Sequence, residues 1–281
     1  MSKEKLLADI NRSLSYFHED TTKDLRNSQK RYMQSLFVDL MIYMTENKNR
    51  IKSVGTLYLI LNNINNIMLL MFTVLEMDGK RKEDTTTDRV YWESIMGLSI
   101  KYFHFELRCL MDNVAKFVHA NSEKKTPEIS YNKLLNGLKK GKYKEGIPGG
   151  LEDLIVASED WFVFIKSVRD KFIHYDGGIT VFPRQSDTHE IIFSLHENGY
   201  ETIFKGKFIA EYKDLFEYNK NDVMYFRYYM AIIMCNVFNL LEDVSKIYLA
   251  GKKPSGNGKA YNDNFAIYID SSNALISKIS G

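Results

Sequence analysis

Cysteine is scarce in this chain, which has only Cys109 and Cys235 among its 281 residues. Both lie in segments with helical apolar spacing, so we predict a protein of a reducing compartment, with neither a disulfide framework nor a thiolate zinc site. The first residues, MSKEKLLADINRS, contain no apolar run of the kind found in secretory signal peptides. We therefore expect a cytoplasmic protein.

An excess of one charge is also missing. Lysine and arginine together number 38, aspartate and glutamate 36, and the formal net charge is +2. A field of one sign over the whole protein, as in many nucleic-acid binders, is therefore excluded. Any basic surface must be local.

Long uninterrupted apolar runs are rare, and the one candidate is broken by amides. Residues 56–77, TLYLILNNINNIMLLMFTVLEM, are long enough to cross a bilayer, but they include Asn62, Asn63, Asn65 and Asn66. An amide without a partner in hydrocarbon costs several kcal/mol, on the order of the gain from burying an apolar side chain. We predict a buried helix here and no membrane partner.

Proline is limited to four positions, which leaves long stretches free to be helical. Apolar residues at helical spacing predict a mainly α fold. In the first half of the chain we expect one broken or two consecutive helices over 4–48, a helix over 52–78 with Gly79 as C-terminal cap, and a long helix within 85–121. In the second half we expect a short helix near 131–139, a helix that has Ser158 as N-cap and ends before Gly177-Gly178, and a helix over 221–249. Residues 122–150 read as a long surface connection.

The apolar period changes from helix to strand after Gly178. The segments GITVF, EIIFSL and YETIF are β-branched or aromatic, and Asn198-Gly199 suits a tight hairpin. We predict an inserted hairpin or three-stranded sheet at about 178–206. The resulting division is N-terminal helices over 1–80 packing on the core, a helical bundle over 81–250, and a flexible tail over 251–281, whose AIYID segment could add an edge strand or dock late.

The stretch SVRDKFIHYDGG, residues 167–178, carries the strongest candidate site. On a helical wheel Arg169 lies on an apolar flank, between Ile165 and Phe172 on one side and Phe162 and Ile173 on the other. A guanidinium there needs a partner. That partner is either an anionic ligand or a carboxylate of another helix, for which Asp112 and Glu106 are candidates.

His174 follows Arg169 by five residues, which in an unbroken helix is a rotation of about 140° and a rise of about 7.5 Å. The two side chains would then diverge. They could converge if the helix loosens before Asp176-Gly177-Gly178, or if two copies of the chain share one site. The alternative is a surface histidine at a helix C-terminus, where positive charge is stabilised.

The spacing alone is common in this chain. Arginine is followed four to six residues later by histidine at Arg12 and His18, at Arg184 and His189, and at Arg169 and His174. Only the last pair combines an apolar helix before it, a polar residue directly after the arginine, and a helix stop after the histidine.

VRDKFIHYDGG, preceded by the helix FELRCLMDNVAKF and followed by the helix at 221–249, resembles the HEPN superfamily, the helical nucleotide-binding domains of higher eukaryotes and prokaryotes. The match covers roughly residues 86–250. The resemblance implies a core of four or five helices, homodimers with two motifs face to face, and, in active members, metal-independent RNA cleavage. It also implies Arg169 and His174 as catalytic residues and Asp170 in the polar position.

One subgroup of the superfamily has a tyrosine two residues after the histidine, as a target for nucleotidyl modification. Here Asp176 occupies that position and the tyrosine is Tyr175. The chain therefore departs from the toxins that act with a nucleotidyltransferase. Members of the superfamily include bacterial toxins and antiviral defence effectors, so a ribonuclease of this kind, restrained by an antitoxin or other regulatory partner, is the expectation.

RNA supplies its own nucleophile, the 2′-hydroxyl, so the chemistry needs a proton acceptor, a proton donor and positive charge near the phosphorus. His174 can exchange protons near neutral pH and Arg169 can bind the non-bridging oxygens, while a second copy supplies the second histidine. We expect no metal and no cofactor. Lys171 and Tyr175 are candidate substrate-binding residues. Asp112 either orients Arg169 or pairs with Arg108 along its own helix.

A second hypothesis is a catalytically inactive helical module that binds a protein partner or a nucleotide, with Arg169 as a structural ion-pair residue. His104, on the shoulder of an apolar stripe, is interpreted as a core histidine under either hypothesis.

Overall fold

The computed structural model describes residues 3–20, 30–47, 51–83, 89–123, 130–174, 178–182, 190–197, 201–202, 207–218 and 223–281. The helices are α1 (Lys3–Leu14), α2 (Leu36–Glu46), α3 (Ile51–Glu83), α4 (Arg89–Ala120), α5 (Tyr131–Lys139), η2 (Lys144–Gly146, a 3-10 turn), α6 (Leu151–Ala157), α7 (Glu159–His174), α8 (Lys207–Phe216), α9 (Phe226–Leu249) and α10 (Phe265–Ser280). The strands are β1 (Phe17–Asp20), β2 (Lys30–Met33), β3 (Gly178–Phe182), β4 (Ile192–Glu197), β5 (Glu201–Thr202), β6 (Glu217–Tyr218), β7 (Val223–Tyr225) and β8 (Ala260–Tyr261). The fold is mainly α, as predicted.

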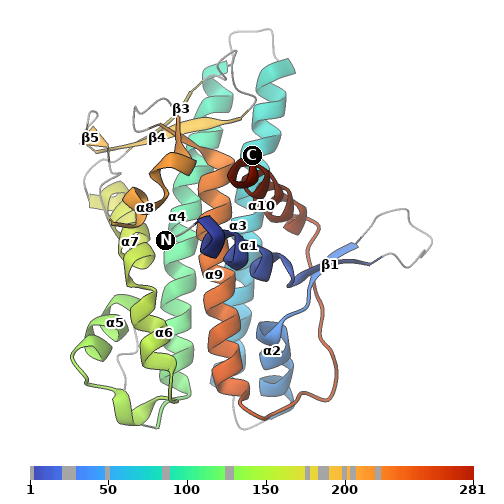
Figure 1. Ribbon diagram of the computed structural model, residues 1–281, viewed down its shortest axis with the longest axis vertical. Coiled ribbons are helices and arrows are strands. Elements are labelled where there is room, and N and C mark those ends of the chain that lie inside the picture. Colours follow the sequence, from blue (N-terminus) through green and yellow to red (C-terminus); the bar gives the residue numbers. More distant parts are fainter. Residues whose placement is uncertain are drawn as a thin grey trace.

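The long helices α3, α4 and α9 run along the longest axis of the molecule (Figure 1). The pair α3 and α4 forms an extended antiparallel hairpin, and α9 packs across it through rings such as Phe117 and Tyr248, whose centroids are 4.9 Å apart. Helix α9 is buried over most of its length, and every residue from Tyr229 to Cys235 is buried, as is typical of a central core helix. It is the centre of the core.

Smaller helices cover α9 on two sides. Helices α1, α2 and α10 lie on one side of it, and α5 to α8 lie on the other (Figure 1). A single cluster of buried apolar residues includes members of the N-terminal helices, the α4–α9 region and α10. Residues 1–80, 81–250 and 265–280 therefore contribute to one shared core.

The N-terminal region departs from the expectation of helices alone. Between α1 and α2 the chain forms β1 and β2, an antiparallel pair in which Phe17 faces Met33, and β8 joins it at Tyr32 and Met33. The sequence predicted helix over residues 4–48 and did not predict these two strands. The few apolar residues of FHED and KRYM also fit a helical period. Helix α3 continues to Glu83, so Gly79 is not its C-terminal cap.

The second sheet confirms the strand predictions and enlarges them. Strands β3, β4 and β5 form where GITVF, EIIFSL and YETIF predicted them, with Val181 opposite Phe193. Strands β6 and β7 extend this sheet in the order β3-β4-β7-β6, and β5 pairs with the last residues of β4 outside this order. Residues 223–225 were expected to begin the last core helix, but they pair with Phe193 and Ile192, and α9 starts at Phe226. The Asn198-Gly199 turn lies outside the described residues.

The C-terminal segment is not a flexible tail. Residues 265–280 form α10, in which Phe265, Tyr268 and Leu275 are fully buried. The glycine- and lysine-rich stretch before it, GKKPSGNGK, suggested a linker, and it does connect α9 to α10 without helix or strand. The AIYID segment docks as helix rather than strand.

Ser158 links α6 to α7, and its side chain does not cap the N-terminus of α7. It follows α6, a short helix that the sequence placed in no element, and its hydroxyl donates to the Ile155 carbonyl at 2.7 Å. The same oxygen contacts the Tyr131 hydroxyl at 2.7 Å, which ties α5 to the start of α7. The predicted helix at 131–139 is confirmed as α5.

Helix α3 is long and apolar enough, by length and composition, to cross a membrane over Ser53–Glu83. One face of this helix lies in the core, where Ile60, Ile64 and Ile67 are almost completely buried. The amides that interrupt it are partly used within the fold: Asn63 donates to Glu106 at 2.7 Å, and Asn65 accepts from Asn262 at 2.9 Å.

Candidate functional site

The candidate motif occupies the C-terminal half of α7. Phe162, Ile165, Val168 and Phe172 are buried and pack this helix against α4, which fixes the direction of the polar residues between them. Arg169 lies at the edge of this apolar stripe, with 33% of its side chain exposed. It is therefore accessible from solvent, although its stem is covered.

Arg169 pairs with its neighbour in the chain. Its Nη1 donates to Oδ1 of Asp170 at 2.8 Å, and Lys166 Nζ lies 3.6 Å from the other oxygen of the same carboxylate. The Asp170 side chain is itself 30% exposed. An ion pair of this exposure contributes little to stability, about 0–1 kcal/mol.

The two carboxylates considered as structural partners of Arg169 are engaged elsewhere. Glu106 accepts from Asn63. Asp112 pairs with Arg108 four residues away along α4 and also accepts the Tyr131 N–H at 2.8 Å. The prediction that Asp112 orients Arg169 was therefore wrong, and the alternative pairing with Arg108 is what the structure contains. Asp112 anchors the first turn of α5 on α4.

His174 is the last residue of α7 and is exposed. Because α7 stays helical from Arg169 to His174, the two side chains leave the helix about 140° apart, with about 7.5 Å between their positions along the axis. The helix does not loosen before the histidine, so one chain alone does not bring the pair together. Lys171 is half-buried on the same turn, and Tyr175 lies outside the described residues.

Cys109 lies on α4, close enough to Arg169 for the guanidinium charge to affect the pKa of the thiol. Partial burial raises the pKa of the Cys109 thiol, Glu106 and Asp112 raise it further, and Arg169 lowers it. The thiol is therefore protonated near neutral pH, which excludes it as an activated nucleophile beside the motif.

His104 is a core histidine, as predicted. It is fully buried, Nδ1 lies 2.8 Å from the Ile100 carbonyl and Nε2 lies 2.5 Å from the Tyr229 hydroxyl. Burial lowers the pKa of His104 from 6.5 to about 4, so the ring is neutral at physiological pH. Its contact with Tyr229 crosses from α4 to α9, a partnership that no local sequence signal indicates.

The neutral His104 makes stability depend on pH. Between pH 6.5 and about 4 the His104 imidazole is protonated in the unfolded chain and neutral in the folded chain. The free energy of unfolding should therefore be unaffected by this group above pH 6.5, fall by about 2 kcal/mol at pH 5, and lose about 3 kcal/mol below pH 4. Urea unfolding at pH 7 and pH 5 should show a smaller decrease in His104→Gln than in wild type. Equal decreases in both proteins would contradict this assignment.

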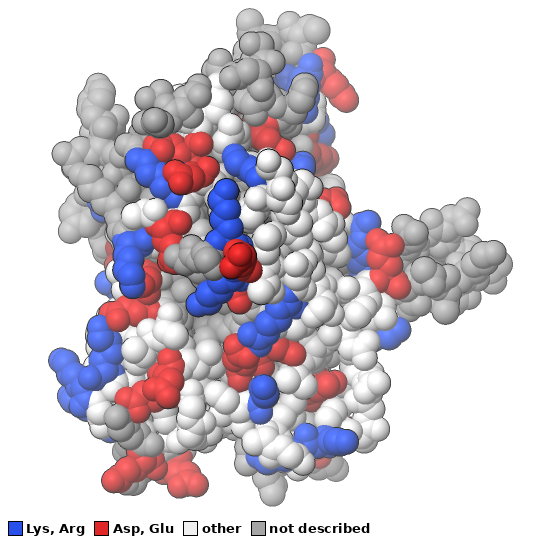
Figure 2. All heavy atoms as spheres, viewed as in Figure 1, with Lys and Arg blue, Asp and Glu red and all other residues white. Residues whose placement is uncertain are grey.

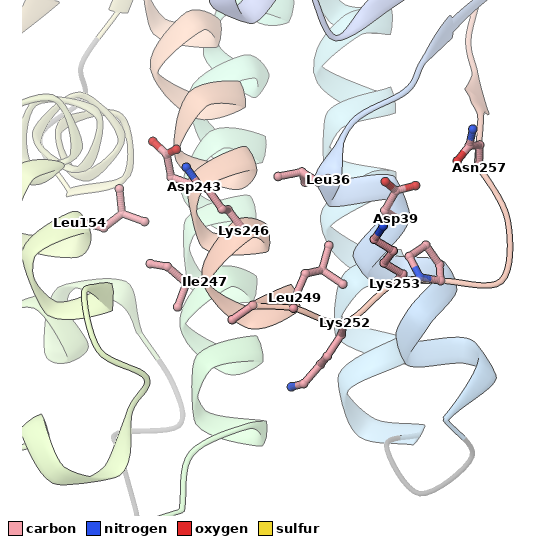
Figure 3. A pocket seen from close by; sticks show the side chains of 13 residues that line it. Leu36, Asp39, Leu154, Asp243, Lys246, Ile247, Leu249, Lys252, Lys253 and Asn257 are labelled. Atoms are coloured by element: carbon pink, nitrogen blue, oxygen red, sulfur yellow. The ribbon is translucent and has the colours of Figure 1, made fainter.

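A pocket of about 970 Å³ opens at the end of α9, away from the motif. Figure 3 shows Asp243, Lys246 and Ile247 on one wall, Asp39 and Lys253 on another, and Lys252 pointing away from Asp243. Burial raises the pKa of Asp39, which also accepts the Gly258 N–H. Two acidic and three basic side chains share this pocket, and no residue of α7 lines it. This pocket was not predicted from the sequence, because KKP, residues 252–254, lies in a stretch that was predicted to be a flexible linker.

Charges of both signs are interspersed over the face in Figure 2. Within the described ranges, no group of three or more histidine, cysteine, aspartate or glutamate side chains is placed to hold a metal ion. Of the residues predicted from the sequence to form the site, the structure places Arg169, Asp170, Lys171 and His174 on the last two turns of α7.

Comparison with protein families, with curated proteins and with solved structures found no match to this chain.

Proposed function

We propose that the protein is a metal-independent endoribonuclease that cleaves single-stranded RNA, and that its active site is built from two copies of the chain. The observation that supports the proposal most is the environment of Arg169. Asp112 and Glu106, which a structural role would require as partners, bind other groups, and Arg169 is one-third exposed beside Asp170. A phosphate can reach such a guanidinium.

The divergence of Arg169 and His174 along α7 accounts for the second copy. In a two-fold assembly, Arg169 of one chain and His174 of the other can face the same phosphate. One His174 accepts the proton of the 2′-hydroxyl as its oxygen attacks phosphorus. The partner's His174 donates a proton to the departing 5′-oxygen. The products are a 2′,3′-cyclic phosphate and a 5′-hydroxyl, and Arg169 stabilises the charge that builds on the non-bridging oxygens.

The resemblance of VRDKFIH to the HEPN motif supports the same activity. It adds the proposal of a cytoplasmic toxin or antiviral defence effector whose activity an antitoxin or another regulatory partner controls. The exposed residues at the end of α7 are accessible to either RNA or such a partner. Single-stranded RNA is the favoured substrate because in-line attack needs a flexible backbone.

The same divergence also favours a second candidate, a helical module without activity. In that case Arg169 and His174 are unrelated surface residues. Because the Arg169–Asp170 pair is partly exposed, Arg169→Ala should then change the free energy of unfolding by less than about 1 kcal/mol. The first candidate predicts RNA cleavage by the purified protein, and the second predicts none.

The test is cleavage of a fluorescent single-stranded RNA in EDTA. We expect cutting by wild type and loss to background in both Arg169→Ala and His174→Ala, because each removes one half of the composite site. The cyclic phosphate should be found on the new 3′ end by mass spectrometry. A mixture of the two variants should stay close to background, since a mixed dimer keeps only one of the two His174 side chains that the mechanism uses as base and acid.

Arg31→Ala and His119→Ala serve as matched controls, because Arg31 lies on β2 and His119 near the end of α4, outside the motif. Both should cut like wild type. Absence of cleavage in wild type would support the inactive module instead. Cleavage that persists in both Arg169→Ala and His174→Ala would contradict the assignment of the active site to these residues.

A further inference from the structure

The outward face of α3 is unusual for a helix in contact with water. Tyr58, Leu59, Leu69 and Phe72 are 50%, 48%, 52% and 41% exposed. Between Lys52 and Glu76 the sequence has no aspartate, glutamate, lysine, arginine or histidine. A solvated helix face normally carries charged residues at this spacing, so this face has the composition of a contact surface.

The amides on this helix divide into two pairs. Asn63 and Asn65 are bonded within the fold, to Glu106 and Asn113 in the first case and to Asn262 in the second. Asn62 and Asn66 are exposed, and the described part of the chain gives neither of these amides a hydrogen-bond partner. The two outward amides thus have donors and acceptors available for another molecule.

The order of residues along this face is symmetric about position 64. The stripe reads Gly55, Leu59, Asn62, Asn66, Leu69 and Thr73, with intervals of four, three, four, three and four residues. These positions lie within about 40° of one line along the helix. Intervals of three and four are those of a helix that packs against another along a narrow seam.

We propose that two copies of the chain pair through antiparallel α3 helices, with the two-fold axis crossing the outward face of the helix at the level of position 64. Leu59 then lies against Leu69 of the second copy, and Asn62 lies against Asn66. A two-fold contact places each residue beside its symmetry partner, which favours a face without charge and with amides, since an amide is both donor and acceptor.

A lipid surface fits this face less well, because Asn62 and Asn66 at its centre would lose water without gaining partners. The length also suits a protein contact. Residues 55–73 span about 27 Å, and pairing over this length with the flanking Tyr58 and Phe72 would bury on the order of 1,000 Å² in total, near the lower limit for a specific interface. The dimer should therefore dissociate on dilution in the micromolar range.

The contact is distinct from the α7 contact that the proposed nuclease needs, because α3 is not the helix that carries Arg169 and His174. A chain that makes both contacts assembles into tetramers or larger species, and loss of the α3 contact alone reduces these to dimers. Its test reads the molecular mass in solution and not RNA cleavage. By sedimentation velocity over a range of concentrations, Leu59→Lys and Leu69→Lys should each halve the mass and weaken association by at least about 100-fold, because each buries an unpaired ammonium. Val90→Lys, at an exposed apolar position on α4, is the control and should associate like wild type.

The combination Leu59→Lys with Leu69→Glu tests the register. In the antiparallel pair each lysine meets the glutamate of the other copy, and we expect association to return to within about tenfold of wild type. A parallel pair would place like charges together and stay dissociated. The proposal is overturned if wild type is monomeric at high micromolar concentration, if the single variants leave the mass unchanged, or if the double variant stays dissociated. Binding of wild type to phosphatidylcholine vesicles that Leu59→Lys abolishes would overturn it in favour of a lipid surface.

Discussion

A chain that ends at Asn262 is expected to lose cooperative folding. This truncation removes α10, whose Phe265, Tyr268 and Leu275 are fully buried. Burial of these side chains, with Ile267 and Ile279, is worth on the order of 10 kcal/mol before the cost of ordering the helix. Small domains have a net stability of only about 5–15 kcal/mol. Removal of the helix therefore takes away a large part of the total.

The cut also exposes the surface beneath α10. The Phe265 ring packs on Phe17 at 5.1 Å, the Tyr268 ring packs on Phe238 at 4.9 Å, and the Tyr268 hydroxyl lies 2.5 Å from that of Ser13. Without α10, apolar residues of α1, β1 and α9 would face water. Near-ultraviolet circular dichroism should disappear, and thermal unfolding should lose its sharp transition.

Single substitutions separate packing from folding failure. Tyr268→Ala should lower the free energy of unfolding by about 4 kcal/mol, because it leaves a cavity between α1 and α9. Tyr268→Phe should cost about 1 kcal/mol, through loss of the contact with Ser13. Asp270→Ala, on the exposed face of the same helix, should change stability by less than about 0.5 kcal/mol. A truncated chain with the melting temperature of wild type would show that residues 265–281 are dispensable.

Replacement of Arg81 by methionine is expected to lower the free energy of unfolding by about 3 kcal/mol. Arg81 is 4% exposed at the end of α3, and its Nη2 donates to Asp78 at 2.5 Å, which is 2% exposed. Its Nη1 also contacts Glu93 of α4 and the Phe182 carbonyl of β3 at 3.3 and 3.1 Å. Loss of the guanidinium removes the buried charge partner of a nearly inaccessible carboxylate, and Lys82, which lies 3.3 Å from its other oxygen, is itself 49% exposed.

The double variant Arg81→Met with Asp78→Leu should recover at least half of the loss, because no buried charge is then stranded. Lys80→Met is the matched control. Lys80 pairs with Glu76 on the exposed side of the same helix, so its removal should cost no more than about 0.5 kcal/mol. Urea unfolding monitored by far-ultraviolet circular dichroism measures all three. A loss for Arg81→Met as small as that for Lys80→Met would contradict a structural role for this cluster.

The sequence predicted the elements whose apolar residues repeat strongly. The helices α4, α5 and α7 and the strands β3 and β4 appear where periodicity placed them. The sequence did not predict short elements whose conformation depends on contacts with residues distant in the chain. Strand β7 continues the apolar helical pattern of α9 in the sequence, and pairing with β4 and β6 makes residues 223–225 extended. Helix α10 follows a linker-like stretch, and its helical state is stabilised by contacts with α1 and α9 rather than by a local signal.

The candidate site was predictable to a different extent. The wheel placed Arg169 at the edge of an apolar stripe, where the structure has it, and it gave the divergence from His174 that a continuous α7 produces. It could not give the partner of Arg169. Asp112 and Glu106 were the predicted candidates, and the observed partner, Asp170, was not one of them. Asp112 instead accepts the Tyr131 N–H at the start of α5, and Glu106 accepts from Asn63.

The N-terminal and C-terminal helices of the chain touch each other, with Ser13 of α1 bonded to Tyr268 of α10 and both helices lying on α9 (Figure 1). Helix α1 therefore cannot complete its packing until the α10 segment has been synthesised. The side of α9 that the two helices cover stays exposed to water until residues 265–280 have left the ribosome.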